Sequence, residues 1–431
     1  MDRTHRSGHR QSRHARVKTA GLALIIAAGA IVSRVLLAYA PARFNVDLAQ
    51  PLPIVTDWGI DGAWLWLVLA ATLGAAFILY LAQLRARLSL THTLLASSLA
   101  LLAGLFWLPL FSSDVYAYAA YGEMARLGLN PYVHHAAGGD ALIAAANWQW
   151  RPVLVPICVY GETFVALARL LVTALHGFGA VAVLTSFRIL SCAALVLCGY
   201  LAGLLGGARA ATFVACNPIA LFAAIEGHND TLLAAAVLLG IVVTRRAPAI
   251  GAGIVALAAS IKLPALAASV ALAFDRILER RDARAVLGGT LVGWAIVAAT
   301  SRAMIAGVRS DLAPHGHYAA YASIQELGIP VAALAGLFVL TRVRAMTTPI
   351  DRWCMLALAA WITIPNPYPW YALWILPLAA FARDRRVVAT TLTVTSAALL
   401  RYLPDAAAIP AGVESLALGA LALTAYAPLV L

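Results

Sequence analysis

Charged residues are scarce in this sequence. Of its 431 residues, 12% are charged and 62% are hydrophobic, whereas about a quarter of an ordinary soluble domain is charged. A water-soluble fold of this size could not bury so many apolar side chains. Apolar runs of roughly 17–25 residues recur from Ala20 onward, each long enough to cross a bilayer as a helix and continuously apolar, unlike a barrel strand. We therefore predict a helical membrane protein.

Lysine and cysteine are also rare. The chain has two lysines, Lys18 and Lys262, and its five cysteines form no CxxC pair. This spacing excludes a disulfide framework and a cysteine-based metal site. His315 and His317 lack the spacing and the further ligands of a metal site, so we expect neither a metal nor a cofactor. The net charge of +12 comes from short basic clusters between apolar runs. Such clusters are typical of cytoplasmic loops, so we expect the lipid bilayer as a partner and no nucleic acid.

The basic clusters also predict the topology. Residues 1–18 form a basic cytoplasmic tail, and residues 19–431 form a single multi-pass membrane domain. The polar and aromatic segment 111–152 is expected to be an outer loop. If the apolar segment 153–176 crossed the membrane, all later basic clusters would face outward, so we interpret it as an interfacial helix. About 11–14 transmembrane helices result, with both termini in the cytoplasm.

Several expected spans are short. Ala210–Ala224 and Trp370–Phe381, for example, contain only about 11–15 residues, and many end at Gly, Pro or Asn. Short or broken helices at membrane depth are tolerated where protein buries them or where they line a polar cavity. These short spans therefore indicate a site within the membrane domain.

Polar residues gather at the expected outer ends of the helices. Asp114 begins the long outer loop, residues 226–230 (Glu-Gly-His-Asn-Asp) join two short spans, and Lys262 stands between two apolar runs. Later outer segments contain Arg302, Arg309, His315 and Tyr371. Ionisable groups at membrane depth are costly to insert and rarely idle.

This set of residues suits the transfer of a sugar from a lipid phosphate to a hydroxyl group. The reaction needs a carboxylate that accepts the proton of the hydroxyl. It also needs cations that stabilise the departing phosphate. Asp114 would supply the carboxylate, and Lys262 the first cation, helped by the His and Arg residues named above. Because the lipid tail of the donor lies in the bilayer, we expect the reaction at the membrane interface.

The same residues resemble a known family. Residues 114–118 (Asp-Val-Tyr-Ala-Tyr) and 128–132 (Gly-Leu-Asn-Pro-Tyr) are similar to the first-outer-loop motif of GT-C superfamily glycosyltransferases. Residues 227–230 (Gly-His-Asn-Asp), the segment around Lys262, and residues 369–371 (Pro-Trp-Tyr) are similar to three later motifs. The resemblance is nearest to bacterial polyprenyl-phosphomannose-dependent mannosyltransferases and extends from about Ser112 to Pro377.

This resemblance implies an all-α polytopic GT-C fold and an inverting transfer of a hexose, mannose first among them. The donor would be a polyprenyl-phosphate sugar and the acceptor a glycolipid or polysaccharide, at the periplasmic face of the bacterial inner membrane. The family's essential acid would be Asp114. Substrate would be bound by Tyr116, Tyr118, His228, Asn229, Asp230, Lys262, Arg302, Arg309, His315 and Tyr371. Many members place the acid after the first helix, so Asp47, Asp57 and Asp61 stay open as alternatives.

Simpler roles compete with these assignments. Asp114 and Asp230 are residue types that cap helix N-termini, and Lys262 could snorkel to the interface. At the level of the whole chain, the alternative is a secondary transporter or a lipid-linked-sugar flippase, which shares the broken helices and intramembrane charges. A transporter predicts internal repeats and polar groups near the bilayer midplane. A non-catalytic scaffold would need no acid and cation gathered at one face.

Overall fold

In the described residues of the computed structural model, every regular element is a helix, as the apolar runs predict. The structure describes residues 19–36, 63–109, 111–150, 154–278, 280, 282–311, 348–363 and 368–407. A first helix spans Thr19–Leu36. The following elements are α2 Ala63–Ala86, α3 Leu90–Gly104, α4 Asp114–Arg126, α5 Ala141–Trp150, α6 Glu162–Leu175, η2 His176–Phe178, α7 Ala180–Ala215, α8 Pro218–Glu226, α9 Asp230–Thr244, α10 Pro248–Leu257, η3 Ala258–Ser260, α11 Ala265–Leu278, α12 Ala283–Thr300, α13 Arg302–Asp311, α15 Pro349–Thr363, η5 Pro369–Trp374, α16 Leu376–Ala379 and α17 Arg385–Ala407.

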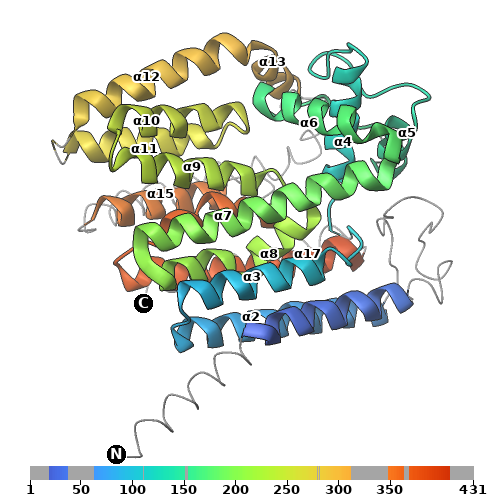
Figure 1. Ribbon diagram of the computed structural model, residues 1–431, viewed down its shortest axis with the longest axis horizontal. Helices are drawn as coiled ribbons and strands as arrows, with labels where there is room; N and C mark the ends of the chain where they lie inside the picture. Colours follow the sequence, from blue (N-terminus) through green and yellow to red (C-terminus); the bar gives the residue numbers. More distant parts are fainter. Residues whose placement is uncertain are drawn as a thin grey trace, which may run out of the picture.

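Most of the long helices run side by side along the longest axis of the molecule (Figure 1). In this view α2 and α3 lie lowest and α12 lies uppermost, with α7 and α9 between them. The helices α4, α5 and α6 gather at one end of this array, where α4 packs against both α5 and α6. The arrangement is a helical layer structure with a helical cap at one end.

Four described helices are long and apolar enough to cross a membrane: Thr19–Leu36, Leu67–Ala86, Ala180–Ala215 and Ala283–Thr300. The pair α8 and α9 adds a fifth candidate, bent by 118° at the residues between the two helices. Two shorter apolar helices, Leu90–Gly104 and Pro248–Ser260, stand beside them. The chain is therefore a multi-pass membrane protein, and the expected total of 11–14 spans remains a prediction because parts of the chain lie outside the described residues.

Local sequence explains the bent pair. The side chain of Asn217 accepts a hydrogen bond from the Ile219 amide at 3.0 Å, and Pro218 occupies the first turn of α8. Both are strong signals for a helix start. Gly227 ends α8 with a φ of +89°, a backbone angle that residues other than glycine rarely adopt. The chain then turns at once into α9.

Two expected spans differ from the structure. Residues 210–224 do not form one helix. The helix α7 bends at Gly207 (φ 77°) and continues to Ala215, and α8 then starts at Pro218 after its N-cap Asn217. The expected span Trp370–Phe381 is wrong as well, because the chain there forms the 3-10 helix η5 and the four-residue α16. Pro377 lies inside the expected span and lacks the N–H for an α-helical hydrogen bond, which explains why η5 does not continue into a longer helix.

The outer segment contains more helix than a loop. Residues 111–150 include α4 and α5, and residues 154–161 form no helix before α6 begins at Glu162. The interfacial helix expected over 153–176 is therefore shorter than predicted at its start. Phe164, Val165, Ala168 and Val172 form the buried face of α6. The opposite face is exposed, so α6 is amphipathic as expected.

Three of the four apolar clusters in the described residues contribute side chains around the α8–α9 turn. The first combines helices α2, α3, α7, α8 and α17 and includes Trp370. The second joins α4, α5, α6 and the start of α7 and includes Tyr160. The third joins α9, α10, α11 and α12, with Trp374 packed against it. Buried polar residues collect at the junction of the three clusters, which is the candidate site described next.

Candidate active site at the α8–α9 turn

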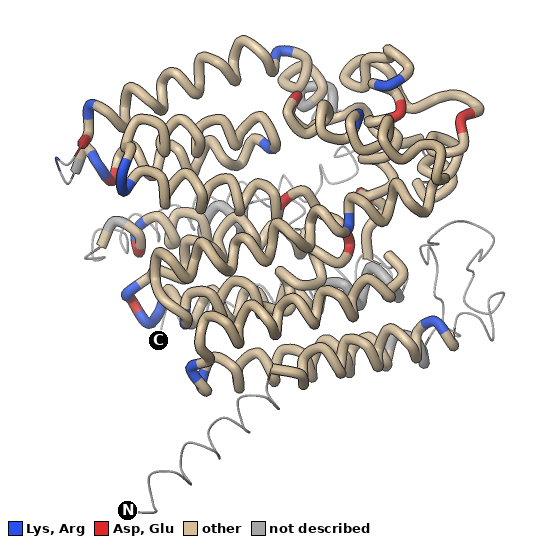
Figure 2. Tube along the Cα trace, in the orientation of Figure 1, with Lys and Arg blue, Asp and Glu red and all other residues tan. Residues whose placement is uncertain are grey.

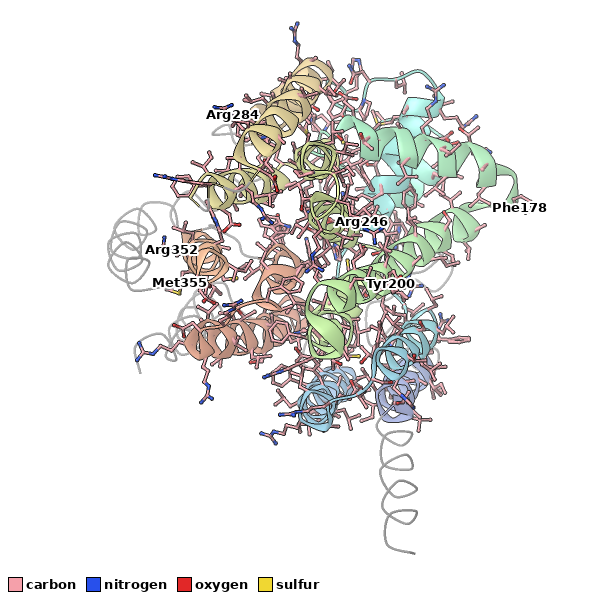
Figure 3. The ribbon with its side chains drawn as sticks, turned by 60° about the vertical axis from the view of Figure 1, so that its left-hand side comes forward. Phe178, Tyr200, Arg246, Arg284, Arg352 and Met355 are labelled. Carbon is pink, nitrogen blue, oxygen red and sulfur yellow. The ribbon has the colours of Figure 1, made fainter. Side chains whose placement is uncertain are left out.

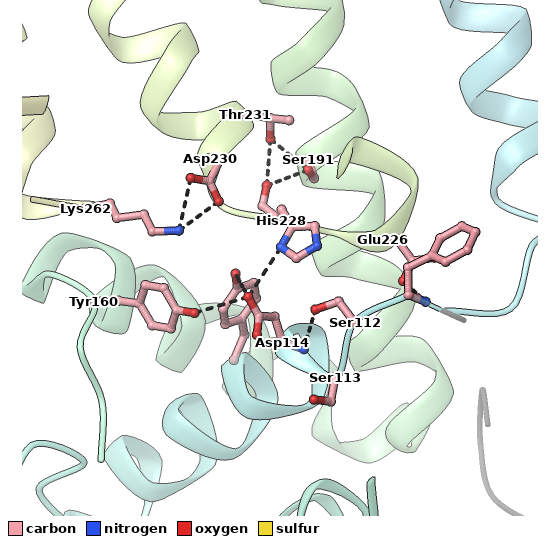
Figure 4. A network of polar contacts seen from close by, with 12 residues as sticks. Ser112, Ser113, Asp114, Tyr160, Ser191, Glu226, His228, Asp230, Thr231 and Lys262 are labelled. Atoms are coloured by element: carbon pink, nitrogen blue, oxygen red, sulfur yellow. Dashed lines mark hydrogen bonds and ion pairs between the residues drawn. The ribbon is translucent and has the colours of Figure 1, made fainter. Parts of the chain in front are cut away.

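Asp114 lies at the first residue of α4 and directs its carboxylate toward the α8–α9 turn (Figure 4). Its Oδ2 atom lies 3.4 Å from the hydroxyl of Tyr118, 3.3 Å from the hydroxyl of Tyr160 and 3.4 Å from Nδ1 of His228. The side chain is 15% exposed, so it is partly accessible. The N-cap residue of α4 is Ser113, and its side chain makes no capping bond. The Asp114 carboxylate therefore serves the tyrosines and His228 rather than the helix end.

His228 is fully buried and is held from two sides. Its imidazole stacks on the indole of Trp370, with ring centroids 3.9 Å apart and an angle of 18° between the planes. Tyr368 stacks in turn on Trp370 at 4.7 Å. The Nδ1 atom faces the Asp114 carboxylate at 3.4 Å, an ion-pair contact when the imidazole is protonated. The position of this ring is thus fixed by an aromatic stack from η5 on one side and by a carboxylate from α4 on the other.

Lys262 and Asp230 form the second charged pair of the site. The ammonium nitrogen of Lys262 lies 3.0 Å from Oδ1 and 2.9 Å from Oδ2 of Asp230. Trp374 donates its indole N–H to Oδ1 of Asp230 at 2.6 Å. Asp230 is the first residue of α9, where the helix dipole favours a negative charge. Lys262 does not snorkel: it is 9% exposed and paired inside the protein.

Three aromatic rings surround the Lys262 ammonium. The ring centroids of Tyr371, Tyr160 and Trp374 lie 5.0, 5.5 and 5.7 Å from its nitrogen. These distances are within the range of favourable cation–π contacts. Because the Tyr160 hydroxyl also contacts Asp114, its side chain connects the two charged pairs. Acid and cation thus share one aromatic neighbour, Tyr160.

The surroundings keep Asp114 ionised. Burial alone would raise the pKa of this carboxyl group. The contact with His228, the positive charge of Lys262 and the hydrogen bond from Tyr160 outweigh burial, and they hold the pKa of Asp114 below its ordinary value. A carboxylate in this state is available as a proton acceptor at neutral pH.

Several residues predicted to bind substrate join this group, and others do not. His228, Asn229, Asp230, Lys262, Tyr118 and Tyr371 all lie around the α8–α9 turn, within the contacts given above or next to them in the chain. Tyr116 points elsewhere, toward Glu226 and Arg188. Arg302 is exposed at the start of α13. The side chain of Arg309 and all of His315, Asp47, Asp57 and Asp61 lie outside the described residues, so their roles stay predictions.

The sequence reading missed three residues that shape the site. Tyr160 and Trp374 contact the charged pairs directly; Tyr160 stands beside Gly161, which was an available signal, whereas Trp374 lies between Leu373 and Ile375 and has no such neighbour. The third is Arg188 of α7, which is 1% exposed. An arginine inside an apolar run is itself a sign of function or of buried structure.

Arg188 fixes the two chain segments that carry the site. Its guanidinium donates to the carbonyl oxygens of Ile225 (2.6 Å), Trp107 (2.9 Å), Gly104 (3.1 Å) and Leu105 (3.2 Å). These carbonyls end α3 and α8, where the helix dipoles favour a cation. The segment after α3 leads to Asp114, and the segment after α8 leads to His228. Arg188 therefore sets the distance between the acid and the turn.

One group of residues has the ligand types of a metal site. Single ligand atoms of Glu123, Asp140 and His176 lie within 4.8 Å of one another. Arg126, however, donates to both oxygens of Glu123, at 2.7 and 2.5 Å. This bidentate pair already neutralises the buried carboxylate. We assign the group a structural role, because it ties α4, the start of α5 and the end of α6 together.

Comparison with known proteins identifies the family. Residues 17–276 match the family described as "Alpha-(1->6)-mannopyranosyltransferase, N-terminal domain". The chain is also 26% identical over 352 residues to "Alpha-(1->6)-mannopyranosyltransferase A" of Mycobacterium tuberculosis (strain ATCC 25618 / H37Rv). That alignment covers 69% of this chain and 66% of the relative, just under two thirds of its length. No solved structure matches. The matched region contains Asp114, the α8–α9 turn and Lys262, and the expected resemblance is confirmed: the chain belongs to the alpha-(1→6)-mannopyranosyltransferase family.

Proposed function

We propose that the protein transfers a mannose residue from a polyprenyl-phosphate donor to a hydroxyl group of a glycolipid or polysaccharide. The observation that carries the proposal is the joint placement of Asp114 and Lys262. An ionised, partly accessible carboxylate and a buried ammonium are linked by one side chain, Tyr160, within a membrane protein. The family to which the chain belongs supports the choice of mannose.

The chemistry follows from this placement. Asp114 accepts the proton of the acceptor hydroxyl as its oxygen attacks the anomeric carbon. The bond between the anomeric carbon and the phosphate oxygen breaks, and the electron pair leaves with the polyprenyl phosphate. Lys262 stabilises the negative charge of this leaving group. Two of the three N–H donors of Lys262 face Asp230, which leaves one for a phosphate oxygen.

A single displacement of this kind inverts the configuration at the anomeric carbon. The family description specifies an α-(1→6) linkage. An inverting enzyme that forms an α linkage requires a β-linked donor. The acceptor would then offer the primary hydroxyl at its sixth carbon, which is the most flexible hydroxyl of a hexose.

The distribution of basic residues supports a site on the periplasmic side. Lys and Arg residues gather along one edge of the helical array (Figure 2). Figure 3, in which this side comes forward, shows Arg246, Arg284 and Arg352 on several different helices. The helix α9 begins in the site at Asp230 and ends at this edge. Its 15 residues, at a rise of about 1.5 Å each, span about 22 Å. Because basic residues mark the cytoplasmic ends of membrane helices, the site would face the periplasm.

The test is transfer by purified protein in liposomes. Radiolabelled polyprenyl-phosphate mannose and glucose are supplied separately, with a membrane lipid extract as the acceptor. We expect label to move from the mannose donor into a new product. An Asp114→Asn variant should lose transfer by about 10²–10⁴-fold, the usual contribution of a general base.

The outcomes separate the alternatives. Full transfer by Asp114→Asn would remove Asp114 as the base without removing the activity. Transfer from the glucose donor alone would contradict the assignment of mannose as the transferred sugar. If neither donor reacts and labelled donor crosses the bilayer instead, the transporter or flippase alternative replaces the enzyme.

A further inference from the structure

The side chain of Asn229 is buried without a hydrogen-bond partner. Asn229 is 1% exposed, and neither Oδ1 nor Nδ2 has a partner among the described residues. The Nε2 atom of His228, one residue earlier, is buried and unpaired in the same way. An amide has two donors and can accept two hydrogen bonds, and almost all buried amides satisfy some of them. Two adjacent side chains with unpaired polar atoms therefore need an explanation.

A helix-capping role does not explain Asn229. The residue occupies the N-cap position of α9, where asparagine is a preferred type. Its side chain nevertheless makes no capping hydrogen bond. Asn217 provides the contrast, because it occupies the N-cap of the neighbouring helix α8 and does cap it through the Ile219 amide. The same residue type at the same position thus has two different uses in consecutive helices.

The surroundings of Asn229 restrict what it can bind. Its neighbours in the chain belong to the two charged pairs, His228 with Asp114 and Asp230 with Lys262. The Tyr118 hydroxyl lies within hydrogen-bonding reach of the Asn229 backbone. A phosphate is a poor match for the amide, because an ionised phosphate only accepts hydrogen bonds and would leave the Asn229 carbonyl oxygen without a donor. A neutral group that both donates and accepts hydrogen bonds fits better, and a hydroxyl is such a group.

We propose that the Asn229 amide hydrogen-bonds to two neighbouring hydroxyl groups of a hexose ring and makes transfer depend on them. The amide presents its N–H and its carbonyl oxygen side by side, which matches one hydroxyl that accepts and one that donates. The inference rests on the proposed function and specifies how the same site selects its sugar. The ring could belong to the donor or to the acceptor, since both are hexoses in this reaction.

The effect on rate follows from the cost of a lost partner. A site that hydrogen-bonds a substrate hydroxyl rejects an analogue without it far more strongly than an apolar pocket would. We expect the wild type to lose roughly ten- to a hundredfold in kcat/KM when one contacted hydroxyl is replaced by hydrogen. Asn229→Ala should lose a similar factor with the complete sugar. With the deoxygenated sugar, the kcat/KM of Asn229→Ala should fall little further, because the contact is already lost.

The experiment compares the wild type, Asn229→Ala and the matched control Asn217→Ala. Each is assayed with the polyprenyl-phosphate mannose donor and with donors deoxygenated at one hydroxyl at a time. A second series keeps the complete donor and deoxygenates the acceptor sugar. Coupling between Asn229→Ala and a deoxy-donor places the donor sugar at Asn229, and coupling with a deoxy-acceptor places the acceptor there. Asn217→Ala should discriminate between the sugars as the wild type does.

Thermal unfolding provides the independent readout. Asn217→Ala should lower the Tm, because it removes a helix cap. Asn229→Ala should leave the Tm unchanged or raise it, because it removes an unsatisfied buried amide. Equal sugar discrimination by Asn229→Ala and wild type in both series would overturn the inference, as would a fall in Tm equal to that of Asn217→Ala. A wild type that transfers from no donor would instead refute the proposed function, and the inference with it.

Discussion

Asp230 and Lys262 form a bidentate ion pair across 32 residues of sequence, with both carboxylate oxygens within 3.0 Å of the ammonium nitrogen. The pair joins the start of α9 to the segment between η3 and α11. Trp374 adds a hydrogen bond from η5 at 2.6 Å. Three separate chain segments therefore converge on one carboxylate, so the pair is both a structural connection and the source of the cation in the proposed reaction.

A double-mutant cycle on this pair should show strong coupling. Lys262→Met and Asp230→Asn each leave one buried group without its partner, and each should lower the free energy of unfolding by about 3–5 kcal/mol. The double variant should lose clearly less than the sum of the two. Unfolding in detergent micelles, followed by circular dichroism, measures the three values.

The control for this cycle is the pair Asp275 and Arg276, whose charged atoms lie 4.0 Å apart near the surface. Asp275→Asn should change stability by less than about 1 kcal/mol, because this half-buried pair is partly solvated and its contact is long. Additive effects of Lys262→Met and Asp230→Asn would show that the two side chains do not depend on each other.

The pH dependence of transfer should report the environment of Asp114. The carboxylate acts when ionised, and its pKa lies below the ordinary value. Activity should therefore be flat with respect to this group at neutral pH and fall only as the pH drops through that lowered pKa. Tyr160→Phe keeps the ring near Lys262 but removes the hydroxyl that stabilises the carboxylate. The pKa of Asp114 should rise, and the acid-side loss of activity should move to higher pH.

Tyr121→Phe is the matched control for Tyr160→Phe. The Tyr121 hydroxyl donates to the carbonyl oxygen of Pro156 at 2.9 Å rather than to Asp114. Its removal should leave the acid limb of the pH profile where the wild type has it. An acid limb that stays in place in Tyr160→Phe would mean that a different group limits the rate at low pH.

The same Asp114 contacts stabilise the fold above the unfolded-state pKa of this carboxyl group, and this contribution disappears as the pH falls through the folded-state pKa.

The sequence predicted the charged residues of the site better than their aromatic frame. Asp114, His228, Asp230 and Lys262 were identifiable because charges are rare in an apolar chain and each stood at the end of an apolar run. Tyr160 and Trp374 were not, since aromatic residues also form the interfacial belts of membrane proteins, and Trp370 was recognised only as part of the Pro-Trp-Tyr motif at residues 369–371. Only the fold brings η5 beside the α8–α9 turn, 140 residues earlier in the chain.

Helix boundaries show a similar division. The sequence carries local signals for the start of α8 at Asn217 and Pro218 and for its end at Gly227, although the expected span Ala210–Ala224 ran through the first two. The continuous α7 does not, because hydropathy alone cannot tell a bend at Gly207 from a break between two spans. Arg188 was overlooked for the related reason that its four partners are backbone carbonyls, which no side-chain motif reveals.

Arg188→Met should destabilise the protein and also impair the site. The substitution removes the guanidinium donor from four carbonyl oxygens, of which Gly104 keeps the Trp107 amide as a second donor, and we expect a loss on the order of 3 kcal/mol in the free energy of unfolding. Arg169→Met is the control, since Arg169 is exposed on α6 and should change stability by less than about 0.5 kcal/mol. Chemical denaturation in mild detergent compares the two. Equal stability of the two variants would contradict the role of Arg188 at the ends of α3 and α8.

Gly161 sets the distance between Tyr160 and Lys262. Its amide donates to the carbonyl oxygen of Ile261 at 3.0 Å, so the two segments run in direct contact. A Cβ atom at Gly161 would lie 2.0 Å from the carbonyl oxygen of Ser260, which is backbone and cannot rotate away. Gly161→Ala must therefore push the Tyr160 segment away from the segment that carries Lys262.

In Gly161→Ala we expect a large fall in kcat and only a small fall in the Tm. The three apolar clusters lie mostly outside this contact, whereas Tyr160 touches both Asp114 and Lys262 and moves with Gly161. A misplacement of about 1 Å can cost on the order of 10²-fold in rate. Gly177→Ala is the matched control, because a Cβ at Gly177 meets no atom within 4 Å. Transfer at the wild-type rate by Gly161→Ala would show that the contact between Tyr160 and the Lys262 segment is dispensable for the reaction, because the backbone cannot accept the new methyl group without separating them.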